Sequence, residues 1–309
     1  MGAVVVAVAD RDSAWPAVRW AAAEALGRGC ALHLVHVGEH PGAAEALGWS
    51  PAEALRELDG VDERVLQQLR RQALHAAPAL TVSTEVVHDR PRRALLHASG
   101  RAELLVLGAR SHARRRAGAL GSTALFLTAH APCPVAVVRA APPDAARGVV
   151  VGHDGSTAAD AAVGFAAALA RRDAEELLVV RAWQPCGVPP RAATPRDVER
   201  RALQGLHDAR RELEAVVLRL GREHPGLFVE TRVVEDPFAS DALLDVSQRA
   251  RLLVVGSRGH GAFASALLGS TSHAVLHGAD VPVVVVPDPA RVRESRAVPV
   301  LQGSSTGGR

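Results

Sequence analysis

The stretch that decides the fold is Leu252-Leu253-Val254-Val255-Gly256-Ser257-Arg258-Gly259, which is followed after nine further residues by Gly269-Ser270-Thr271. It begins as an apolar run typical of a buried strand, continues as a glycine loop and ends where a helical pattern starts. We expect the glycines to turn the backbone with positive φ and to bring amides close to a ligand. Because the amides of a helix start point the same way, the stretch predicts a phosphate site.

The same stretch occurs 148 residues earlier in the chain in an altered form. Leu104 to Gly108 repeat the strand and its first glycine, Gly121-Ser122-Thr123 repeat the helix start, and residues 134–138 match residues 282–286. The chain is therefore a tandem duplication, and each half is expected to form the same kind of domain.

The two copies differ at two positions where a ligand would lie. Ser111 stands where the second copy has Gly259, and Ala9 stands where it has Asp154. Asp10 follows one residue later, but a shift of one residue in an extended segment reverses the direction of the side chain. A serine costs about 1–2 kcal/mol if its position needs positive φ, and a lost charged hydrogen bond costs about 1.5–3 kcal/mol. These differences predict one ligand per chain, bound in the second half.

Both halves resemble the universal stress protein domain, over about residues 3–139 and 148–287. The resemblance rests on Asp154 and on the pattern G-x2-G-x9-G-[ST], formed by Gly256, Gly259, Gly269 and Ser270. It implies an α/β fold of two tandem doubly wound domains, each a five-stranded parallel sheet with helices on both faces, of the adenine nucleotide alpha hydrolase-like type. It also implies ATP binding at the carboxyl ends of the strands, dimers, and a role in stress or dormancy physiology.

The predicted domains are residues 1–140, with a degenerate nucleotide site, and residues 148–288, with an intact one. Apolar runs separated by helical patterns predict parallel strands that are buried on both faces. The predicted strands are residues 3–8, 31–37, 81–87, 103–107 and 135–138, and then 148–153, 177–182, 229–234, 252–255 and 281–286. Residues 140–147 are the predicted linker, and residues 289–309, which lack a periodic apolar pattern, are predicted to be a disordered tail.

Two helices of the second half have predicted ends. Thr157-Ala158-Ala159-Asp160 has the spacing of a capping box and predicts a helix that reaches about Ala170. Leucines and valines recur at helical spacing between Asp197 and Leu220, and Gly221 is placed to end that helix.

Composition excludes several classes of protein. The chain of 309 residues contains no lysine, so it has neither a Walker A lysine nor a kinase lysine nor an internal Schiff base. A net charge of +3 does not by itself indicate nucleic acid binding, and no apolar run has the roughly 18 residues of a membrane span. Three cysteines without C-x-x-C spacing predict a reducing, cytoplasmic location.

The resemblance implies a role for each residue of the second-half site. Asp154 would hydrogen-bond the adenosine moiety, although an acid at this position also caps helices. Loop amides would hold the triphosphate, and Ser270 and Thr271 offer hydroxyls to the phosphates or to magnesium. The full predicted set is Gly152, His153, Asp154, Ala182, Val255, Gly256, Arg258, Gly259, Gly269, Ser270 and Thr271.

Three charged or titratable features leave alternatives open. His153 is either a general base or a wall of the site, and no nucleophile or partner acid at useful spacing favours the base. Arg258 either meets a phosphate or is solvated. The run Arg114-Arg115-Arg116 either captures an anion or is a solvated charge run, since no aromatic platform accompanies it.

The predicted function is ATP binding that changes conformation or partner choice rather than rapid turnover. A slow magnesium-dependent ATP hydrolase and a ligand-free interaction scaffold are the alternatives, and the sequence does not identify the protein partner. The last strand of each half should lie at a sheet edge, and an apolar edge invites pairing. We therefore expect the halves to pack as an intramolecular pseudo-dimer, with dimerisation of whole chains as a further step.

Overall fold

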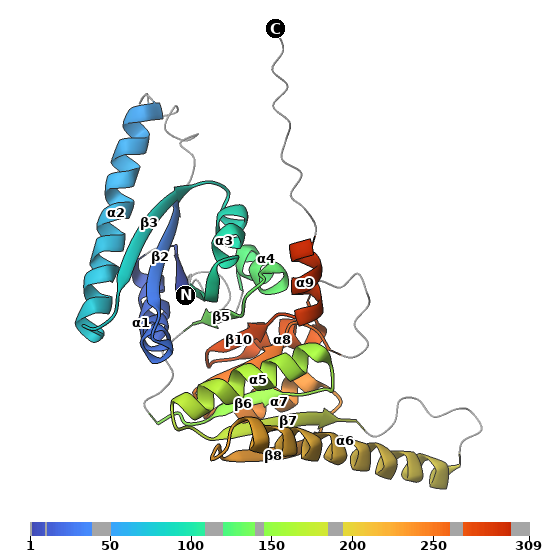
Figure 1. Cartoon of the computed structure of the whole chain (residues 1–309). Helices are drawn as coiled ribbons and strands as arrows, with labels where there is room; N and C mark the ends of the chain where they lie inside the picture. The colour runs from blue at the N-terminus through green and yellow to red at the C-terminus, as the bar shows by residue number, and fades with distance from the viewer. Residues whose placement is uncertain are drawn as a thin grey trace.

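The computed structural model describes residues 2–9, 11–38, 51–108, 120–139, 145–184, 194–259 and 268–297. In the first half, strands alternate with helices along the chain (Figure 1). Its elements are β1 (Ala3–Val8), α1 (Arg11–Arg28), β2 (Ala31–Gly38), α2 (Pro51–Ala76), β3 (Val82–His88), α3 (Pro91–Ser99), β4 (Ala102–Gly108), α4 (Ser122–His130) and β5 (Val135–Val138).

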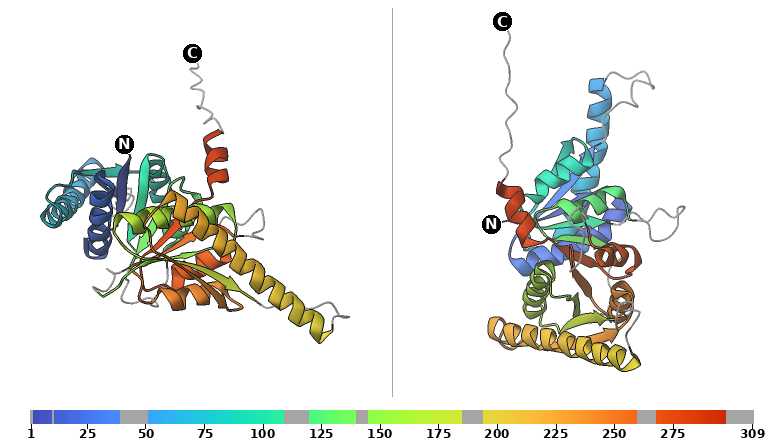
Figure 2. Two further views of the ribbon diagram at one scale, coloured as in Figure 1. Left: turned by 60° about the horizontal axis from the view of Figure 1, so that its bottom comes forward. Right: turned by 90° about the vertical axis from the view of Figure 1, so that its right-hand side faces the viewer.

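The second half repeats this order and adds one helix at its end. Its elements are β6 (Val149–Gly152), α5 (Thr157–Arg172), β7 (Leu177–Trp183), α6 (Pro195–Glu223), β8 (Val229–Glu235), α7 (Ala239–Ser247), β9 (Leu252–Gly256), α8 (Ser270–Gly278), β10 (Val283–Val286) and α9 (Pro289–Ala297). Two further views show α6 extending well beyond the end of the sheet (Figure 2).

The strands form one ten-stranded sheet in the order β3-β2-β1-β4-β5-β10-β9-β6-β7-β8. Neighbours within each half are parallel, and each half has its five strands as predicted. Strand order reverses direction between β1 and β4 in the first half and between β6 and β9 in the second. Open α/β sheets bind their ligands in the crevice at such a point, beyond the carboxyl ends of the strands.

The two halves meet edge to edge at the centre of this sheet. β5 and β10 pair antiparallel, with Val137 opposite Val283 and Val135 opposite Val285. All residues of both strands are buried. The expected pairing of the two apolar edges therefore takes place within the chain.

Helices cover both faces of the sheet. Side chains of α1, α2, α5 and α6 share one apolar cluster with the strand residues of that face, and this cluster runs through both halves. On the opposite face, α3 and α4 pack on the first half, and α7 and α8 pack on the second. The alternation of Val4 and Val6 with Val5 between the two faces is the pattern of a strand that is buried on both sides.

Arginines also join the two halves at the ends of two helices. The guanidinium of Arg139, just after β5, donates to the carbonyl oxygens of Leu276 and His277 at the end of α8. Reciprocally, Arg291 of α9 donates to the carbonyl oxygen of Ala129 at the end of α4 (3.3 Å). Each half thus satisfies carbonyl groups that the last turn of a helix leaves without intrahelical partners.

Two predicted helix ends are wrong by a few residues. The side chain that caps α5 belongs to Ser156, whose Oγ accepts from the amide of Ala159 (3.2 Å), and Thr157 is instead the first residue of the helix. Gly221 lies inside α6, which ends at Glu223, and the positive φ of +87° belongs to Gly226. Capping depends on local geometry that spacing alone does not specify, because neighbouring hydroxyls have the same chemistry.

The predicted disordered tail is wrong in its first part, because residues 289–297 form α9. The carboxylate of Asp288 accepts from the amide of Ala290 (3.0 Å), and its carbonyl oxygen accepts from the amide of Val292 (3.2 Å). Pro289 follows the cap at a position where a missing amide costs nothing. Capping and a proline start thus stabilise a helix without an apolar stripe, whereas residues 298–309 lie outside the described residues.

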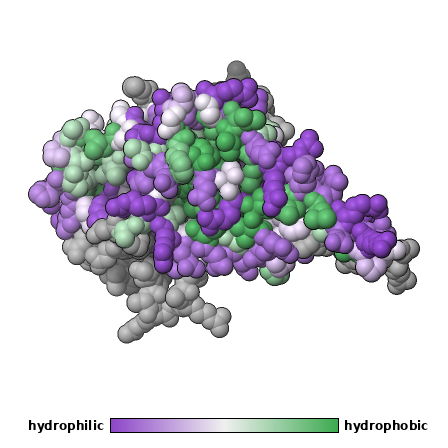
Figure 3. All heavy atoms as spheres, turned by 90° about the horizontal axis from the view of Figure 1, so that it is seen from below, coloured by the Kyte–Doolittle hydropathy of each residue, from purple (hydrophilic) through white to green (hydrophobic). Residues whose placement is uncertain are grey.

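Large apolar side chains are also present at the surface. On the face seen from below, they gather near the middle and hydrophilic side chains surround them (Figure 3). The exposed large apolar residues of the described chain are Leu26, Val61, Leu203, Leu218, Phe228 and Phe238.

Among the helices of the described segments, none combines the length and the apolar character that crossing a membrane requires.

Candidate functional site

A cavity of about 620 Å³ lies at the carboxyl ends of β6 and β9, where the strand order reverses. This volume is typical of small-molecule sites. All eleven residues predicted for the site line it, and they come from four described parts of the chain: residues 152–154, residue 182, residues 255–259 and residues 269–271. Sequence reasoning missed seven further lining residues, which are Ala159, Val180, Ala239, Leu243, Leu268, Ser272 and His273.

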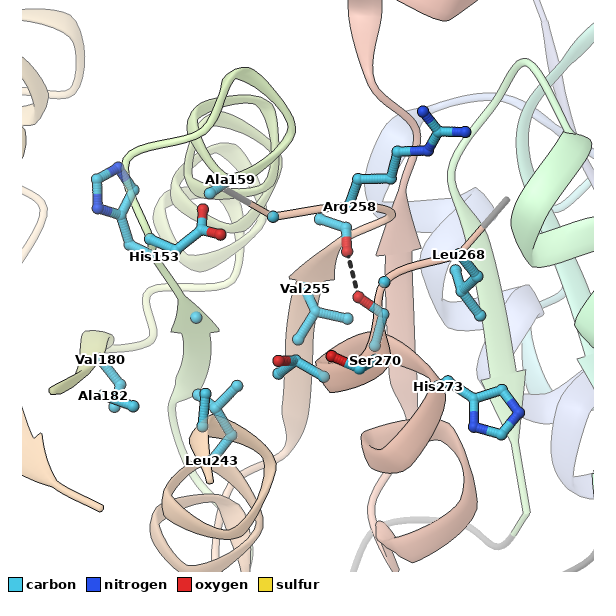
Figure 4. A pocket seen from close by; sticks show the side chains of 18 residues that line it. His153, Ala159, Val180, Ala182, Leu243, Val255, Arg258, Leu268, Ser270 and His273 are labelled. Carbon is cyan, nitrogen blue, oxygen red and sulfur yellow. Dashed lines mark hydrogen bonds between the residues drawn. The ribbon is translucent and has the colours of Figure 1, made fainter. Parts of the chain in front are cut away.

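The side chains come from both faces of the sheet and from two helix starts (Figure 4). Val255 and Ser270 face the middle of the cavity, and Leu243 approaches from α7 below the sheet edge. Leu243 packs where a Cβ on Gly152 would lie, 2.9 Å from its Cδ1, so a larger residue at position 152 would displace this wall. No periodicity in the sequence indicated that α7 contributes to the site.

Gly256 and Gly259 lack a side chain because space is short, and the predicted positive φ is wrong for both. Positive φ does not occur at Gly256, Gly259 or Gly269. A Cβ on Gly256 would lie 2.8 Å from the backbone carbon of Ala158, and one on Gly259 would lie 2.2 Å from Oδ2 of Asp154. Positive φ occurs instead at Gly155, with φ of +82°, a glycine outside the predicted pattern.

Asp154 lies between the end of β6 and the glycine loop. Its Oδ1 accepts a hydrogen bond from the amide of Ser156 (3.0 Å), which forms a tight turn before α5. Its Oδ2 faces Gly259, because a Cβ built on this glycine would lie too close to Oδ2. The carboxylate therefore has the local turn contact of a capping acid and also forms part of the cavity wall.

The start of α8 presents hydrogen-bond donors to the cavity. Gly269 is the N-cap of this helix and supplies no side-chain cap, and its amide donates to the carbonyl oxygen of Ser257 (2.9 Å). Ser270, Thr271 and Ser272 of the first turn line the cavity, and the hydroxyl of Ser272 donates to the carbonyl oxygen of Gly256 (2.6 Å). A helix start without a side-chain cap attracts anions.

His153 is buried, and its ring is turned away from the start of α8 (Figure 4). Its Nε2 lies 3.4 Å from Oδ1 of Asp160, which also pairs with Arg219 (2.9 Å). Burial lowers the pKa of His153 below its ordinary value, and the hydrogen bond with Asp160 opposes this only in part. These contacts favour the interpretation of His153 as a wall of the site.

Arg258 extends from the loop away from Ser270 and towards the first half (Figure 4). Its carbonyl oxygen accepts from the hydroxyl of Ser156 (3.4 Å), which holds the loop against the start of α5. The structure thus gives the backbone of Arg258 a position in the cavity wall, and the role of its guanidinium stays a prediction.

Strand pairing supports the alignment of Ala9 with Asp154. Val4 pairs with Leu104 as Val149 pairs with Leu252, so Ala9 lies as far along the chain from Val4 as Asp154 lies from Val149. At the other end of the first-half site, Gly121 has φ and ψ of −65° and 149°, close to the −68° and 150° of Gly269. The first half therefore retains the helix start and lacks the acid.

Several predicted features of the first-half site lie outside the described residues. These are Asp10, Ser111 and the run Arg114-Arg115-Arg116. Because Gly259 does not need positive φ, the strain argument against Ser111 is wrong, and the difference between the halves rests on Ala9 and on space. A serine Cβ at position 259 would meet Asp154, whereas the first half has only an alanine methyl at the aligned position.

Comparisons with known proteins agree with this architecture. The model of the universal stress protein family matches residues 1–139 and again residues 146–287. A universal stress protein of Mycobacterium tuberculosis is 33% identical over 299 residues, which cover 91% of this chain and 96% of that protein. A universal stress protein of Mycolicibacterium smegmatis is 32% identical over 291 residues, covering 92% and 96% of the two chains.

Among solved structures, a universal stress protein from Archaeoglobus fulgidus is similar in fold. It has a TM-score of 0.69 and 18% identity, and the match covers 92% of this chain and 98% of that one. The two matches of the family model coincide with the two halves of the ten-stranded sheet, and the curated relatives extend across both. The chain is thus a tandem, two-domain member of the universal stress protein family.

Proposed function

We propose that the second-half cavity binds ATP, and that the chain acts in stress response or dormancy regulation through nucleotide-dependent conformation or partner binding. The observation that carries this proposal is the convergence of all eleven predicted residues on one cavity of about 620 Å³. One crevice contains an acid, a glycine loop too tightly packed to accept a Cβ, and a helix start without a side-chain cap. Together they are the parts of a nucleotide site.

The residues present fit an adenine nucleotide. Asp154 would accept hydrogen bonds from the nucleoside, while Val180, Ala182 and Leu243 supply an apolar wall for a base. The loop amides and the hydroxyls of Ser270 and Thr271 would bind the phosphates, and magnesium would accompany them. Described residues contain no cluster of three His, Cys, Asp or Glu side chains that could bind a metal ion independently.

We propose binding rather than turnover. Hydrolysis requires a group that orients or activates water, and the one histidine at the end of β6 turns its ring towards Asp160 instead. We place the protein in the cytoplasm, where the thiols of Cys30 and Cys133, both unpaired, would stay reduced. A steady ADP yield that disappears in Gly259→Val would contradict binding without turnover.

A matched pair of serine variants tests the proposed site. Ser270 begins α8 in the second half, and Ser122 begins α4 at the equivalent position of the first half. We expect Ser270→Ala to weaken ATP binding about threefold to tenfold, because one hydrogen bond to the ligand is lost. Ser122→Ala is expected to bind ATP as the wild type does.

The measurement is competition of ATP, AMP and cyclic AMP against a fluorescent adenine nucleotide, preceded by mass spectrometry of gently purified protein for retained nucleotide. Equal losses in both serine variants would contradict a site confined to the second half. A wild-type protein that retains and binds no adenine nucleotide would leave the ligand-free scaffold as the better account.

A further inference from the structure

Asp288 lies just beyond β10, where three segments of the second half meet. Its Oδ1 accepts hydrogen bonds from the hydroxyl of Thr157 (3.1 Å) and from the amide of Ala290 (3.0 Å). Its own amide donates to the hydroxyl of Ser257 (3.2 Å). One residue therefore contacts the start of α5, the glycine loop and the start of α9.

Two of these partners lie close in sequence to residues that line the candidate site. Thr157 is the first residue of α5, and the next residue, Ala158, is the one against which Gly256 packs. Ser257 is buried within the glycine loop, and its amide donates to the carbonyl oxygen of Val286 (2.7 Å). Its carbonyl oxygen in turn accepts from the amide of Gly269 at the start of α8. Asp288 thus holds the helix start and the loop in fixed positions relative to one another.

The third partner leads to the other half of the molecule. Ala290 is in α9, which packs along α5 and lies next to α4 of the first half (Figure 1). Arg291 of α9 donates to the carbonyl oxygen of Ala129, in the last turn of α4. The start of α4 in the first half is equivalent to the start of α8, which lines the cavity in the second half. A continuous set of contacts therefore runs from the glycine loop through Asp288 and α9 to α4.

We infer that Asp288 is a positioning residue of the nucleotide site, and that α9 transmits occupancy of this site to the first half. The inference rests on the proposed function. A nucleotide that orders the glycine loop and the start of α5 fixes the two groups that Asp288 binds, and so favours the docked position of α9. By linkage, a docked α9 favours nucleotide binding to the same extent.

Three variants test the positioning role. We expect Asp288→Ala and Thr157→Val to weaken ATP binding about threefold to tenfold, because both remove the hydrogen bond between the Thr157 hydroxyl and the Asp288 carboxylate. Asp288→Asn is expected to recover most of the affinity, because an amide oxygen still accepts from Thr157 and Ala290. Glu230→Gln, on the exposed β8 strand, is the control and should leave the affinity unchanged.

The transmission is measured by amide hydrogen exchange of residues 289–297 and 127–131, with and without ATP, in the full chain. We expect ATP to slow exchange in both segments of the wild type, in neither segment of Asp288→Ala, and only in the first segment of Arg291→Ala. Thermal unfolding of each variant verifies that the chain is folded, and Thr157→Val serves if Asp288→Ala does not fold.

The outcomes separate this inference from the proposed function. A wild-type chain that does not bind ATP would contradict the proposed function. The inference alone would be overturned by a different result, in which the wild-type chain binds ATP. In that result Asp288→Ala and Thr157→Val both bind ATP with an affinity within twofold of the wild type, and ATP does not change the hydrogen exchange of residues 289–297.

Discussion

Gly256 and Gly259 differ in what surrounds them, and this difference predicts two separable effects. Gly256→Ala would place a methyl group against the backbone of Ala158, which cannot move without shifting α5. We expect this variant to lower the free energy of unfolding by about 1–3 kcal/mol. Gly259→Ala would meet only the carboxylate of Asp154, which can rotate, so we expect a cost below about 1.5 kcal/mol together with a loss of ATP affinity.

Urea denaturation and nucleotide titration of both variants test this separation. Combining Gly259→Ala with Asp154→Ala, which imitates the alanine of the first half, should recover the stability that Gly259→Ala loses. Equal losses of unfolding free energy in the two glycine variants would contradict the account of crowding at Asp154. A loss in the double variant that exceeds the sum of the losses in Gly259→Ala and Asp154→Ala would also contradict it.

Burial of His153 predicts a pH dependence of stability. Its pKa is lowered in the folded chain, so at mildly acidic pH the unfolded chain binds more protons. The stability is therefore complete above the ordinary histidine pKa of about 6.5 and decreases as pH falls below that value. We expect the melting temperature of the wild type to fall between about pH 7 and pH 5 more steeply than that of His153→Val.

Val8 at the aligned position of the first half indicates that valine fits this environment. The pH-dependent difference between wild type and His153→Val reports the change at position 153, because the rest of the sequence is common to both chains. Parallel pH profiles of the two proteins would show that His153 does not titrate differently in the folded and unfolded states.

At the scale of single residues, all the residues predicted for the site line one cavity, but the predicted physical reason does not hold for each of them. The glycine pattern and Asp154 were informative because parallel strands bring their carboxyl ends to one edge. The reason for the glycines was wrong, since φ cannot be inferred without the path of the backbone. Leu243 and Ala159 were missed because they are ordinary core residues whose positions depend on how α5 and α7 pack.

Among the helices, the cap of α5 gives a prediction that distinguishes two adjacent hydroxyls. Ser156 satisfies the amide of Ala159, whereas the hydroxyl of Thr157 donates outward to Asp288. We expect Ser156→Ala to lower the free energy of unfolding by about 1 kcal/mol and Thr157→Val to lower it by less than half of that. Urea unfolding of the two variants measures the difference. A larger loss of unfolding free energy in Thr157→Val would indicate that Thr157 caps the helix, as the spacing predicts.

Strands were predicted to within two residues at each end, and helices less well. Continuous valine and leucine runs specify buried parallel strands strongly, because no other element of that length buries both faces. Helix ends depend on single hydrogen bonds, as at Ser156 and Asp288. Helix α9 was missed because it lacks an apolar stripe and is stabilised by its cap and by contacts with α5 and α4.

On the scale of the whole molecule, a partly buried ion network joins α1 to α5. Glu24 is 4% exposed, and its two carboxylate oxygens accept from Arg172 (3.0 and 3.1 Å) while one also accepts from Arg28 (3.0 Å). Arg172 in turn binds Asp173, whose pKa is lowered by its hydrogen bonds with Arg172 and Arg251 despite the opposing effect of burial. The network thus ties the first half to the second.

Removing Glu24 leaves the partly buried guanidinium groups of Arg28 and Arg172 without this carboxylate. We expect Glu24→Ala to lower the free energy of unfolding by about 1–3 kcal/mol. The control is Glu230→Gln, whose pair with Arg232 is exposed and should contribute less than about 1 kcal/mol. Chemical denaturation of both variants compares them, and similar small losses would show that the network does not hold the two halves together.

The central sheet also bears on association. The apolar edges that favoured dimerisation are paired within the chain, and the remaining edge strands β3 and β8 carry charged residues such as Glu85 and Arg232. Charged side chains on edge strands oppose edge-to-edge pairing. The argument from the apolar strands β5 and β10 therefore accounts for the intramolecular pseudo-dimer and gives no support to a dimer of whole chains.

Titration calorimetry with ATP and magnesium tests the central claim most directly. The account predicts one nucleotide per chain, binding lost in Asp154→Ala and in Gly259→Val, and an unchanged titration in Ala9→Val, the matched change in the first half. Loss of a charged hydrogen bond at Asp154 amounts to about 1.5–3 kcal/mol, or about 10-fold to 200-fold in affinity. Two nucleotides per chain, or unchanged binding in both second-half variants, would contradict it.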